Sequence, residues 1–132
     1  MVDEIALTMR LFDPSETAYI NETTCKVRWP RDQFNWAKWR EIYTPQVTHT
    51  LSTGRAIVAS ADVHGIPIVL GFALFDRNES LDMLAVKRPF IGNGIGLRLL
   101  KASGVKDLVI TLPTPQWERW TKHHDIKWRQ HG

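Results

Sequence analysis

The segment Ala85–Leu100, AVKRPFIGNGIGLRLL, places three glycines at alternate positions between an apolar run and a second run with helical spacing. Glycine adopts positive φ without steric cost and allows another molecule to approach the main chain closely. At the start of a helix, free backbone N–H groups and the helix dipole together bind phosphate. The segment therefore predicts a phosphate-binding loop that leads into a helix.

The composition fits a single domain over residues 1–132. With 43% hydrophobic and 23% charged residues, the chain has the composition of a globular domain with one core. Its length of 132 residues is too short for a second domain. No apolar run approaches the roughly 20 residues of a membrane helix, and the start MVDEIALTMR lacks the pattern of a secretory signal. We therefore expect a cytoplasmic protein with no membrane partner. A lone cysteine, Cys25, excludes an internal disulfide.

Hydrophobic periodicity predicts an α/β fold with a mixed, largely antiparallel sheet flanked by helices, in the order β-α-α-β-β-β-α-β-α-β. Asp13, followed by Pro14, is expected to cap the first helix, and Pro45 is expected to end the second. The strands are expected at about 4–11, 55–62, 67–76, 80–87, 106–112 and 125–130, and the helices at about 14–27, 32–45, 95–104 and 115–124.

Two common phosphate-binding motifs do not fit the glycine segment. A Walker loop needs Gly-Lys-Ser/Thr at its end, whereas Leu97 and Arg98 follow Gly96. A dinucleotide-binding fold needs glycine at the position of Leu97 and several further βαβ units, yet only 36 residues follow Gly96.

The segment is instead similar to motif A of the Gcn5-related N-acetyltransferases, V-x-P-x-x-R-G-x-G-I-G-x-x-L-L. Pro89 stands one position later than usual, and Ile91 replaces the usual Arg or Gln. The first half of the chain is also similar to small acetyltransferase-like proteins of tailed bacteriophages, which implies the host cytoplasm. The match to motif A is carried by Val86, Pro89, Gly92, Gly94, Ile95, Gly96, Leu99 and Leu100.

This resemblance implies acetyl-CoA as the co-substrate, bound where the strand ending at Val86 separates from the DLVITL strand. Because Ile91 lacks a charged side chain, we expect CoA binding to be weaker by about 1 to 2 kcal/mol. Arg98 would either contact the adenosine phosphate or form part of a solvated basic surface. The same two alternatives apply to Lys87, Arg88 and Lys101. The pantetheine arm and the pyrophosphate would contact Leu84, Ala85, Val86, Ile91, Gly92, Asn93, Gly94, Ile95 and Gly96.

Acyl transfer to an amine needs a base and an acid, and the resemblance gives incomplete candidates for both. The glutamate that the family often carries corresponds to Ser80 here, so the candidate bases are Asp82, acting through a water, and Glu79; either is equally compatible with a surface carboxylate. The tyrosine that usually serves as the acid corresponds to Thr121 or, with a shift of one residue, to Trp120. Neither side chain is a competent acid at neutral pH, so we expect slow turnover.

Three functions remain open from the sequence. The first is acyl transfer from acetyl-CoA to a primary amine of a small molecule or protein. The second is a catalytically weak or inactive CoA-binding or protein-interaction module of phage type. The third is modification of an amine on a nucleic acid, which a net charge of +3 and six tryptophans would suit. A homodimer is left open.

The five histidines do not predict a metal site. His123 and His124 are adjacent, so on a helix their side chains point about 100° apart and cannot chelate one ion as an i, i+4 pair does. We therefore expect no metal cofactor.

Overall fold

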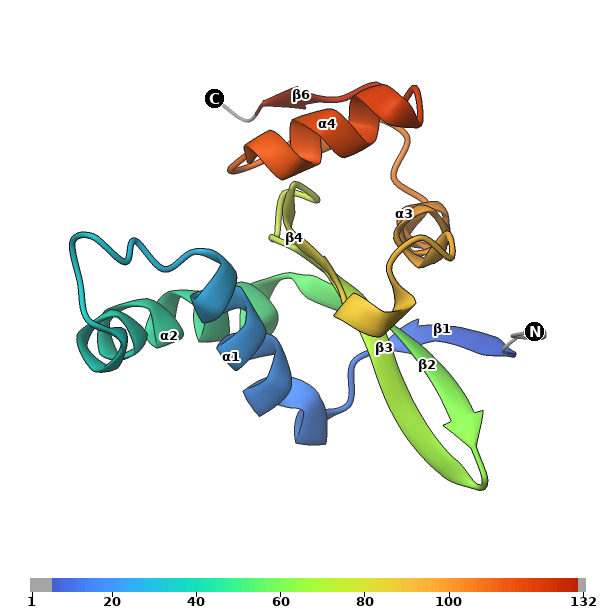
Figure 1. Cartoon of the computed structure of the whole chain (residues 1–132), viewed down its shortest axis with the longest axis horizontal. Helices are drawn as coiled ribbons and strands as arrows, with labels where there is room; N and C mark the ends of the chain where they lie inside the picture. Colours follow the sequence, from blue (N-terminus) through green and yellow to red (C-terminus); the bar gives the residue numbers. More distant parts are fainter. Residues whose placement is uncertain (1–5, 131–132) are drawn as a thin grey trace.

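The six strands in residues 6–130, the part of the chain that the computed structural model describes, form one sheet in the order β1-β2-β3-β4-β5-β6 (Figure 1). Strands β1 to β4 pair antiparallel, whereas β5 runs parallel to β4 and β6 parallel to β5. This arrangement confirms the predicted fold class and order of elements. The strands are β1 (Leu7–Leu11), β2 (Arg55–Val63), β3 (Ile66–Phe75), β4 (Leu81–Val86), β5 (Val109–Ile110) and β6 (Arg129–Gln130), and the helices are α1 (Thr17–Val27), α2 (Trp36–Thr53), α3 (Ile95–Ser103) and α4 (Pro115–His123).

Side chains of β2 alternate between two hydrophobic cores, one on each face of the sheet. Ile57 and Ala59 pack in the core that includes Leu99 of α3. Ala56 and Val58 pack in the core that includes residues of α1 and α2. A strand buried on both faces is apolar at nearly every position, which explains the continuous apolar run in this part of the sequence.

The predicted cap of the first helix is present. Asp13 Oδ1 accepts a hydrogen bond of 2.9 Å from Ser15 N, and Glu16 Oε1 accepts one of 2.7 Å from Asp13 N. Arg10 adds two hydrogen bonds to the Glu16 carboxylate, at 2.9 and 2.7 Å. The first turn, Pro14–Glu16, is a 3-10 helix, and the α-helix itself begins at Thr17.

We expect Glu16→Gln to destabilise the protein at pH 7 and to have a smaller effect at pH 3. The hydrogen bonds from Arg10 hold the pKa of Glu16 below its usual value. A carboxylate with a lowered pKa in the folded state stabilises that state above the unfolded pKa, and the contribution is lost as pH falls through the folded pKa. The melting temperature should therefore fall by about 3 °C at pH 7, with the difference shrinking below about pH 4.

Glu41→Gln is the matched control for this prediction. Glu41 is a surface carboxylate whose side chain is 74% exposed, with Lys38 Nζ 3.9 Å away. Its substitution should change the melting temperature little at either pH, because exposed ion pairs contribute little. An equal loss for Glu16→Gln at pH 3 and pH 7 would show that the Arg10–Glu16 pair does not stabilise the fold.

The predicted start of the second helix is wrong. Helix α2 begins at Trp36 rather than at Asp32, because Asn35 caps it: Asn35 Oδ1 accepts a hydrogen bond of 2.8 Å from Lys38 N. Residues 31–33 form a turn instead.

The predicted end of the second helix at Pro45 is also wrong, because α2 continues to Thr53. Pro45 is exposed, whereas Val47 and Leu51 further along the helix are buried, with 1% and 6% of their surface accessible. Burying two such side chains contributes about 2 kcal/mol each, which offsets the cost of about 3 kcal/mol for an interior proline.

Three strands are shorter than their sequence patterns predict. Strand β5 covers Val109–Ile110 and β6 covers Arg129–Gln130. In the first strand, positions 4 and 5 lie outside the described residues, and the strand begins at Leu7. Among residues 6–130, no helix has the length and apolar character needed to cross a bilayer.

Candidate functional site

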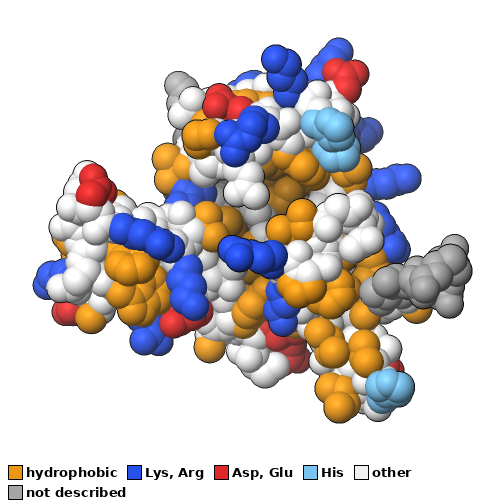
Figure 2. All heavy atoms as spheres, in the orientation of Figure 1, with side chains coloured by type: hydrophobic (Ala, Val, Ile, Leu, Met, Phe, Trp, Pro, Cys, Tyr) orange, Lys and Arg blue, Asp and Glu red, His pale blue; other side chains and the backbone are white. Residues whose placement is uncertain are grey.

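A cavity of about 570 Å³ opens where β4 and β5 separate. Within the described residues these parallel strands are paired at one position, Leu81 with Ile110. Beyond that pair β4 has a free edge, and α4 lies across the gap. Figure 2 shows this face of the molecule hollowed below α4, with hydrophobic side chains inside the hollow. The cavity thus has a strand edge as one wall and a helix as the opposite wall.

Seven of the ten residues expected to contact acetyl-CoA line this cavity: Leu84, Ala85, Val86, Ile91, Gly92, Ile95 and Gly96. The other three, Asn93, Gly94 and Arg98, lie just outside its walls. Asn93 Nδ2 donates a hydrogen bond of 3.2 Å to Phe90 O, which holds the loop between β4 and α3. The structure therefore brings most of the glycine segment and the edge of β4 to one wall.

The glycines of this segment serve two different purposes. Gly92 and Gly94 adopt φ values of +94° and +76°, where side chains are strained, and the space beside their Cα atoms is open. Gly96 has no such φ; a Cβ there would lie 3.1 Å from Trp120 Cζ2 of α4. Gly92 and Gly94 thus turn the chain into α3, while Gly96 lets an indole ring pack on its first turn.

The N-terminus of α3 faces this loop without a side-chain cap. Gly94 is the N-cap residue and has no side chain that can accept a hydrogen bond from the first turn. The first N–H groups of a helix have no partner within the helix, so they are available to an anion. This end of the cavity has the donors that a phosphate group requires.

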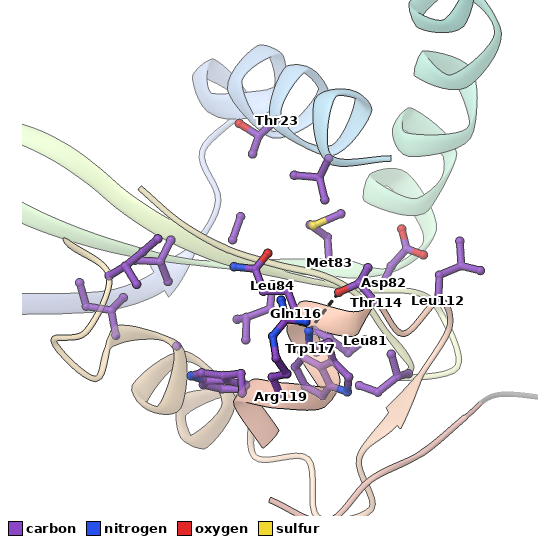
Figure 3. A pocket seen from close by; sticks show the side chains of 18 of the residues that line it. Thr23, Leu81, Asp82, Met83, Leu84, Leu112, Thr114, Gln116, Trp117 and Arg119 are labelled. Carbon is purple, nitrogen blue, oxygen red and sulfur yellow. Dashed lines mark hydrogen bonds between the residues drawn. The ribbon is translucent and has the colours of Figure 1, made fainter. Parts of the chain in front are cut away.

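Asp82 occupies a β-bulge in β4. Leu74 of β3 pairs with Met83, and Phe75 pairs with Leu81, so Asp82 is the extra residue between them. A bulge turns a side chain away from the regular alternation of the strand. Asp82 lines the cavity (Figure 3). Its Oδ1 accepts a hydrogen bond of 2.8 Å from Thr111 Oγ1.

Arg28, at the end of α1, contacts Asp82, which lies 54 positions later in the sequence. Its Nη2 donates a hydrogen bond to the main-chain carbonyl of Asp82, and its side chain lines the same end of the cavity. The Tyr43 phenol is close by: burial raises its pKa, the Arg28 charge lowers it and the Asp82 charge raises it. The cavity therefore has a carboxylate and a guanidinium at the end away from the glycine loop.

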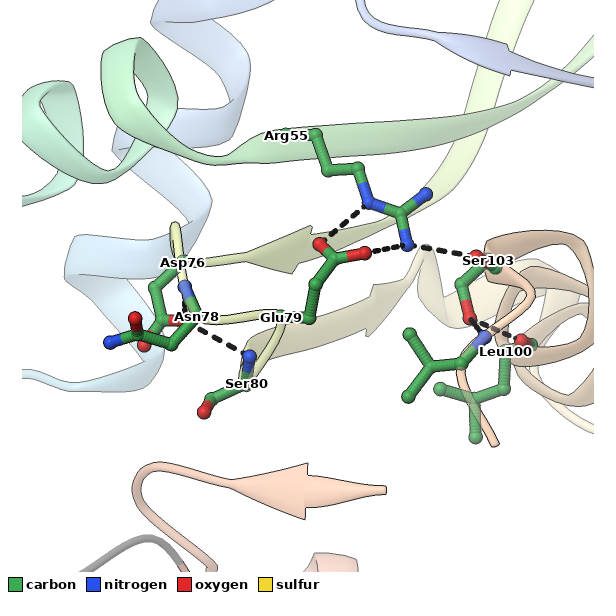
Figure 4. A network of polar contacts seen from close by, with 8 residues as sticks. Arg55, Asp76, Asn78, Glu79, Ser80, Leu100 and Ser103 are labelled. Atoms are coloured by element: carbon green, nitrogen blue, oxygen red, sulfur yellow. Dashed lines mark hydrogen bonds and ion pairs between the residues drawn. The ribbon is translucent and has the colours of Figure 1, made fainter. Parts of the chain in front are cut away.

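Glu79, a candidate base from the sequence, lies outside the cavity. Its carboxylate accepts hydrogen bonds of 2.9 and 2.8 Å from Arg55, which also donates one of 2.8 Å to Ser103 O at the end of α3 (Figure 4). Residue 79 is in the turn before β4, so its side chain joins this turn to β2 and not to the cleft. The structure thus places Glu79, expected as a candidate base, in a pair with Arg55 and away from the cavity.

Thr121, the candidate acid, also lies outside the cavity. It is 1% exposed, and its hydroxyl is within 3.0 Å of Trp117 O and 3.1 Å of Glu118 O. The same oxygen accepts a hydrogen bond of 3.0 Å from Trp128 Nε1. These bonds attach the segment after α4 to the helix, and the Thr121 side chain does not line the cavity.

Other residues of α4 line the cavity in its place. Trp117, Trp120 and His123 face it, together with Arg119. The alternative alignment, shifted by one residue, had placed Trp120 at the position of the acid. Sequence patterns did not single out Arg28 or Arg119, because no local motif distinguishes an arginine that lines a cavity from an exposed one.

Within the described residues, no group of three or more His, Cys, Asp and Glu could hold a metal ion.

No protein-family model matches the sequence, and no curated protein matches it. Solved structures do match its fold. A GCN5-related N-acetyltransferase from Rhodopseudomonas palustris is 18% identical with a TM-score of 0.59, and the match covers 91% of this chain and 82% of that one. YjaB from Escherichia coli, solved in its apo form, is 20% identical with a TM-score of 0.60, over 92% and 80% of the two chains.

A third structure is that of a ligand complex. The aminoglycoside N-acetyltransferase AAC(6')-Iy, solved with CoA, is 14% identical with a TM-score of 0.53, over 100% of this chain and 80% of that one. At these identities the matches show the fold alone. The chain thus has the fold found in GCN5-related N-acetyltransferases.

Proposed function

We propose that this protein transfers an acetyl group from acetyl-CoA to a primary amine. The observation that carries the proposal is the cavity between β4 and β5, which has an uncapped helix N-terminus at one end and Asp82 at the other. The fold supports it, because proteins named as N-acetyltransferases share this fold and one of them was solved with CoA.

The residues present fit acetyl-CoA. The free edge of β4 at Leu84, Ala85 and Val86 offers backbone groups to the pantetheine arm, since β5 pairs with β4 at Leu81. The open space beside Gly92 and Gly94 leaves room for the pyrophosphate near the start of α3. Acetyl-CoA supplies an acyl group activated as a thioester.

In this proposal Asp82 is the base that accepts a proton from the ammonium group of the acceptor, directly or through a water. The hydrogen bond from Thr111 holds the carboxylate in place. Thr121 takes no part, and the sequence-based expectation of a weak acid there becomes unnecessary. A thiol with a pKa near 8.5, by analogy with cysteine, leaves as a thiolate that water can protonate.

We expect Ile91→Arg to tighten CoA binding about tenfold. Ile91 lines the cavity beside the glycine loop and is 59% exposed, so a longer side chain can be accommodated there. A guanidinium at this position would add one charge-assisted hydrogen bond to the pyrophosphate, about 1.5 kcal/mol. Titration calorimetry with CoA measures the change.

Ile91→Leu serves as its control, because it keeps the apolar character and should leave the affinity unchanged. If Ile91→Arg bound CoA no more tightly than Ile91→Leu, the pyrophosphate would not lie beside residue 91.

The proposal as a whole is tested by titrating the protein with acetyl-CoA and then following release of the free thiol in the presence of a panel of primary amines. Binding followed by amine-dependent thiol release is the expected result. Binding without release for any amine would favour the second candidate, a CoA-binding module without catalysis. The nucleic-acid, homodimer and phage alternatives stay predictions from the sequence.

A further inference from the structure

The end of the cavity nearest α1 contains an arginine whose charge has no carboxylate partner. Arg28 is the C-cap residue of α1, is half-buried and lines the cavity. Its Nη2 donates a hydrogen bond to Asp82 O, while its Nε and Nη1 are buried without a hydrogen-bond partner among residues 6–130. The wall of the cavity therefore holds a positive charge that is only partly satisfied.

Arg10, Arg40, Arg55 and Arg129 each have a carboxylate within 4.0 Å, whereas Arg28 and five other arginines have none among the described residues. Arg28 differs from those five because two of its guanidinium nitrogens are buried without a hydrogen-bond partner. Holding an unpaired charge in a protein wall costs free energy, of which the negative end of the α1 dipole offsets a fraction. An anion in the cavity would supply the missing charge partner. It would pair with the second N–H of Nη2, because Nε and Nη1 have almost no accessible surface.

Arg28 and Asp82 present opposite charges at adjacent points of the wall. The guanidinium is bonded to the main-chain carbonyl of the same residue whose side chain is the carboxylate. Such a pair of opposite charges is complementary to a small molecule that carries its ammonium and its carboxylate on one carbon. Two exposed apolar side chains flank this end: Val27, 56% exposed, precedes Arg28, and Leu112, 54% exposed, lies beside Asp82 in Figure 3.

We propose that the acceptor amine is that of a free α-amino acid with an apolar side chain, with its ammonium at Asp82, its carboxylate at Arg28 and its side chain against Val27 and Leu112. This proposal rests on the proposed function, because it names the substrate class of the same site.

The experiment compares leucine with leucinamide, which differ in the carboxylate alone. Acetyl transfer from acetyl-CoA is measured as kcat/KM for both amines in the wild-type protein and in Arg28→Gln. Because the two amines differ in intrinsic reactivity, the readout is the ratio of their kcat/KM values. We expect Arg28→Gln to lower kcat/KM for leucine at least 10-fold, which corresponds to the loss of one charged contact. The value for leucinamide should stay within about twofold of that of the wild type.

Two further variants make the result specific. Arg31→Gln removes an arginine that lies over the Trp29 ring, outside the cavity, and should leave the ratio unchanged. Arg28→Lys keeps the positive charge and should retain part of the preference for leucine, which also covers the case in which Arg28→Gln fails to fold. Equal losses for both amines, or an unchanged ratio in a folded Arg28 variant, would overturn the proposal.

A binding measurement separates this proposal from the proposed function. Leucine is titrated into the CoA-saturated protein by calorimetry, with leucinamide as the comparison. If no amine is acetylated but leucine binds and Arg28→Gln abolishes that binding, the amino acid site stands and the transfer reaction fails. If amines are acetylated without dependence on Arg28, the transfer reaction stands and the amino acid site fails. If leucine neither binds nor reacts with the wild-type protein, the amino acid site is wrong.

Discussion

Replacing Gly96 with valine is expected to weaken CoA binding at least 100-fold, about 2.7 kcal/mol, in a protein that still folds. A Cβ at residue 96 would lie 3.1 Å from Trp120 Cζ2 and 3.6 Å from Leu84 Cδ2. The two further carbons of valine have to displace the indole, and overpacking of this kind typically costs 1 to 3 kcal/mol. The displaced ring and the added side chain would fill the space next to the start of α3.

Ala102→Val is the control for this substitution. Ala102 lies on the same helix but is exposed, so it introduces the same β-branched side chain away from the cavity. Calorimetry with CoA and thermal unfolding should be measured for both variants. A folded Gly96→Val protein with wild-type affinity would show that CoA does not bind at the start of α3.

Replacing Asp82 with asparagine is expected to lower the rate of acetyl transfer about 10- to 100-fold, with CoA affinity unchanged. Asparagine has nearly the same shape, and its side-chain oxygen can still accept the hydrogen bond from Thr111, but it cannot take a proton. An amine that is already deprotonated needs no base, so the loss should be smallest at pH values above the pKa of the acceptor amine.

Glu79→Gln supplies a matched removal of a carboxylate. Glu79 pairs with Arg55 outside the cavity, so its substitution should leave the rate close to that of the wild type. If Asp82→Asn kept full activity, Asp82 would not be the base. If Glu79→Gln lost activity without loss of stability, the turn before β4 would lie closer to the reaction than the structure places it.

The central strands and α3 could be predicted from the sequence to within one residue or so. The pattern predicted strands at 55–62, 67–76 and 80–87, and the structure has Arg55–Val63, Ile66–Phe75 and Leu81–Val86. These strands are long apolar runs bounded by His-Gly and Asp-Arg-Asn-Glu turns, so local signals and burial agree. The glycine loop could also be predicted from the sequence, because the positive φ values at residues 92 and 94 favour glycine.

The features that failed depend on contacts between distant segments. Helix α2 continues beyond Pro45 because Val47 and Leu51 are buried against the sheet. No local sequence pattern indicates this burial. The bulge at Asp82 breaks the regular alternation of side chains along β4, so a period of two in the sequence does not give the direction of that side chain.

The contacts of Thr121 and Arg28 in the candidate site also depend on the fold. The motif resemblance that selects Thr121 says nothing of the hydrogen bonds that its buried hydroxyl makes with Trp117 and Trp128. Arg28 reaches Asp82 through the fold alone, and no residue near it in the sequence indicates that contact.

The free edge of β4 has a consequence for self-association. Unpaired strand edges are templates on which another chain can add a strand, and inner strands normally escape this because both sides are paired. Here an inner strand exposes one side beyond Leu81, but α4 covers the gap, with the Trp117 and Trp120 rings 5.5 Å apart on its cavity side. The helix thus occupies the side of β4 on which another chain would add a strand, and so protects the protein from aggregation at its own cleft.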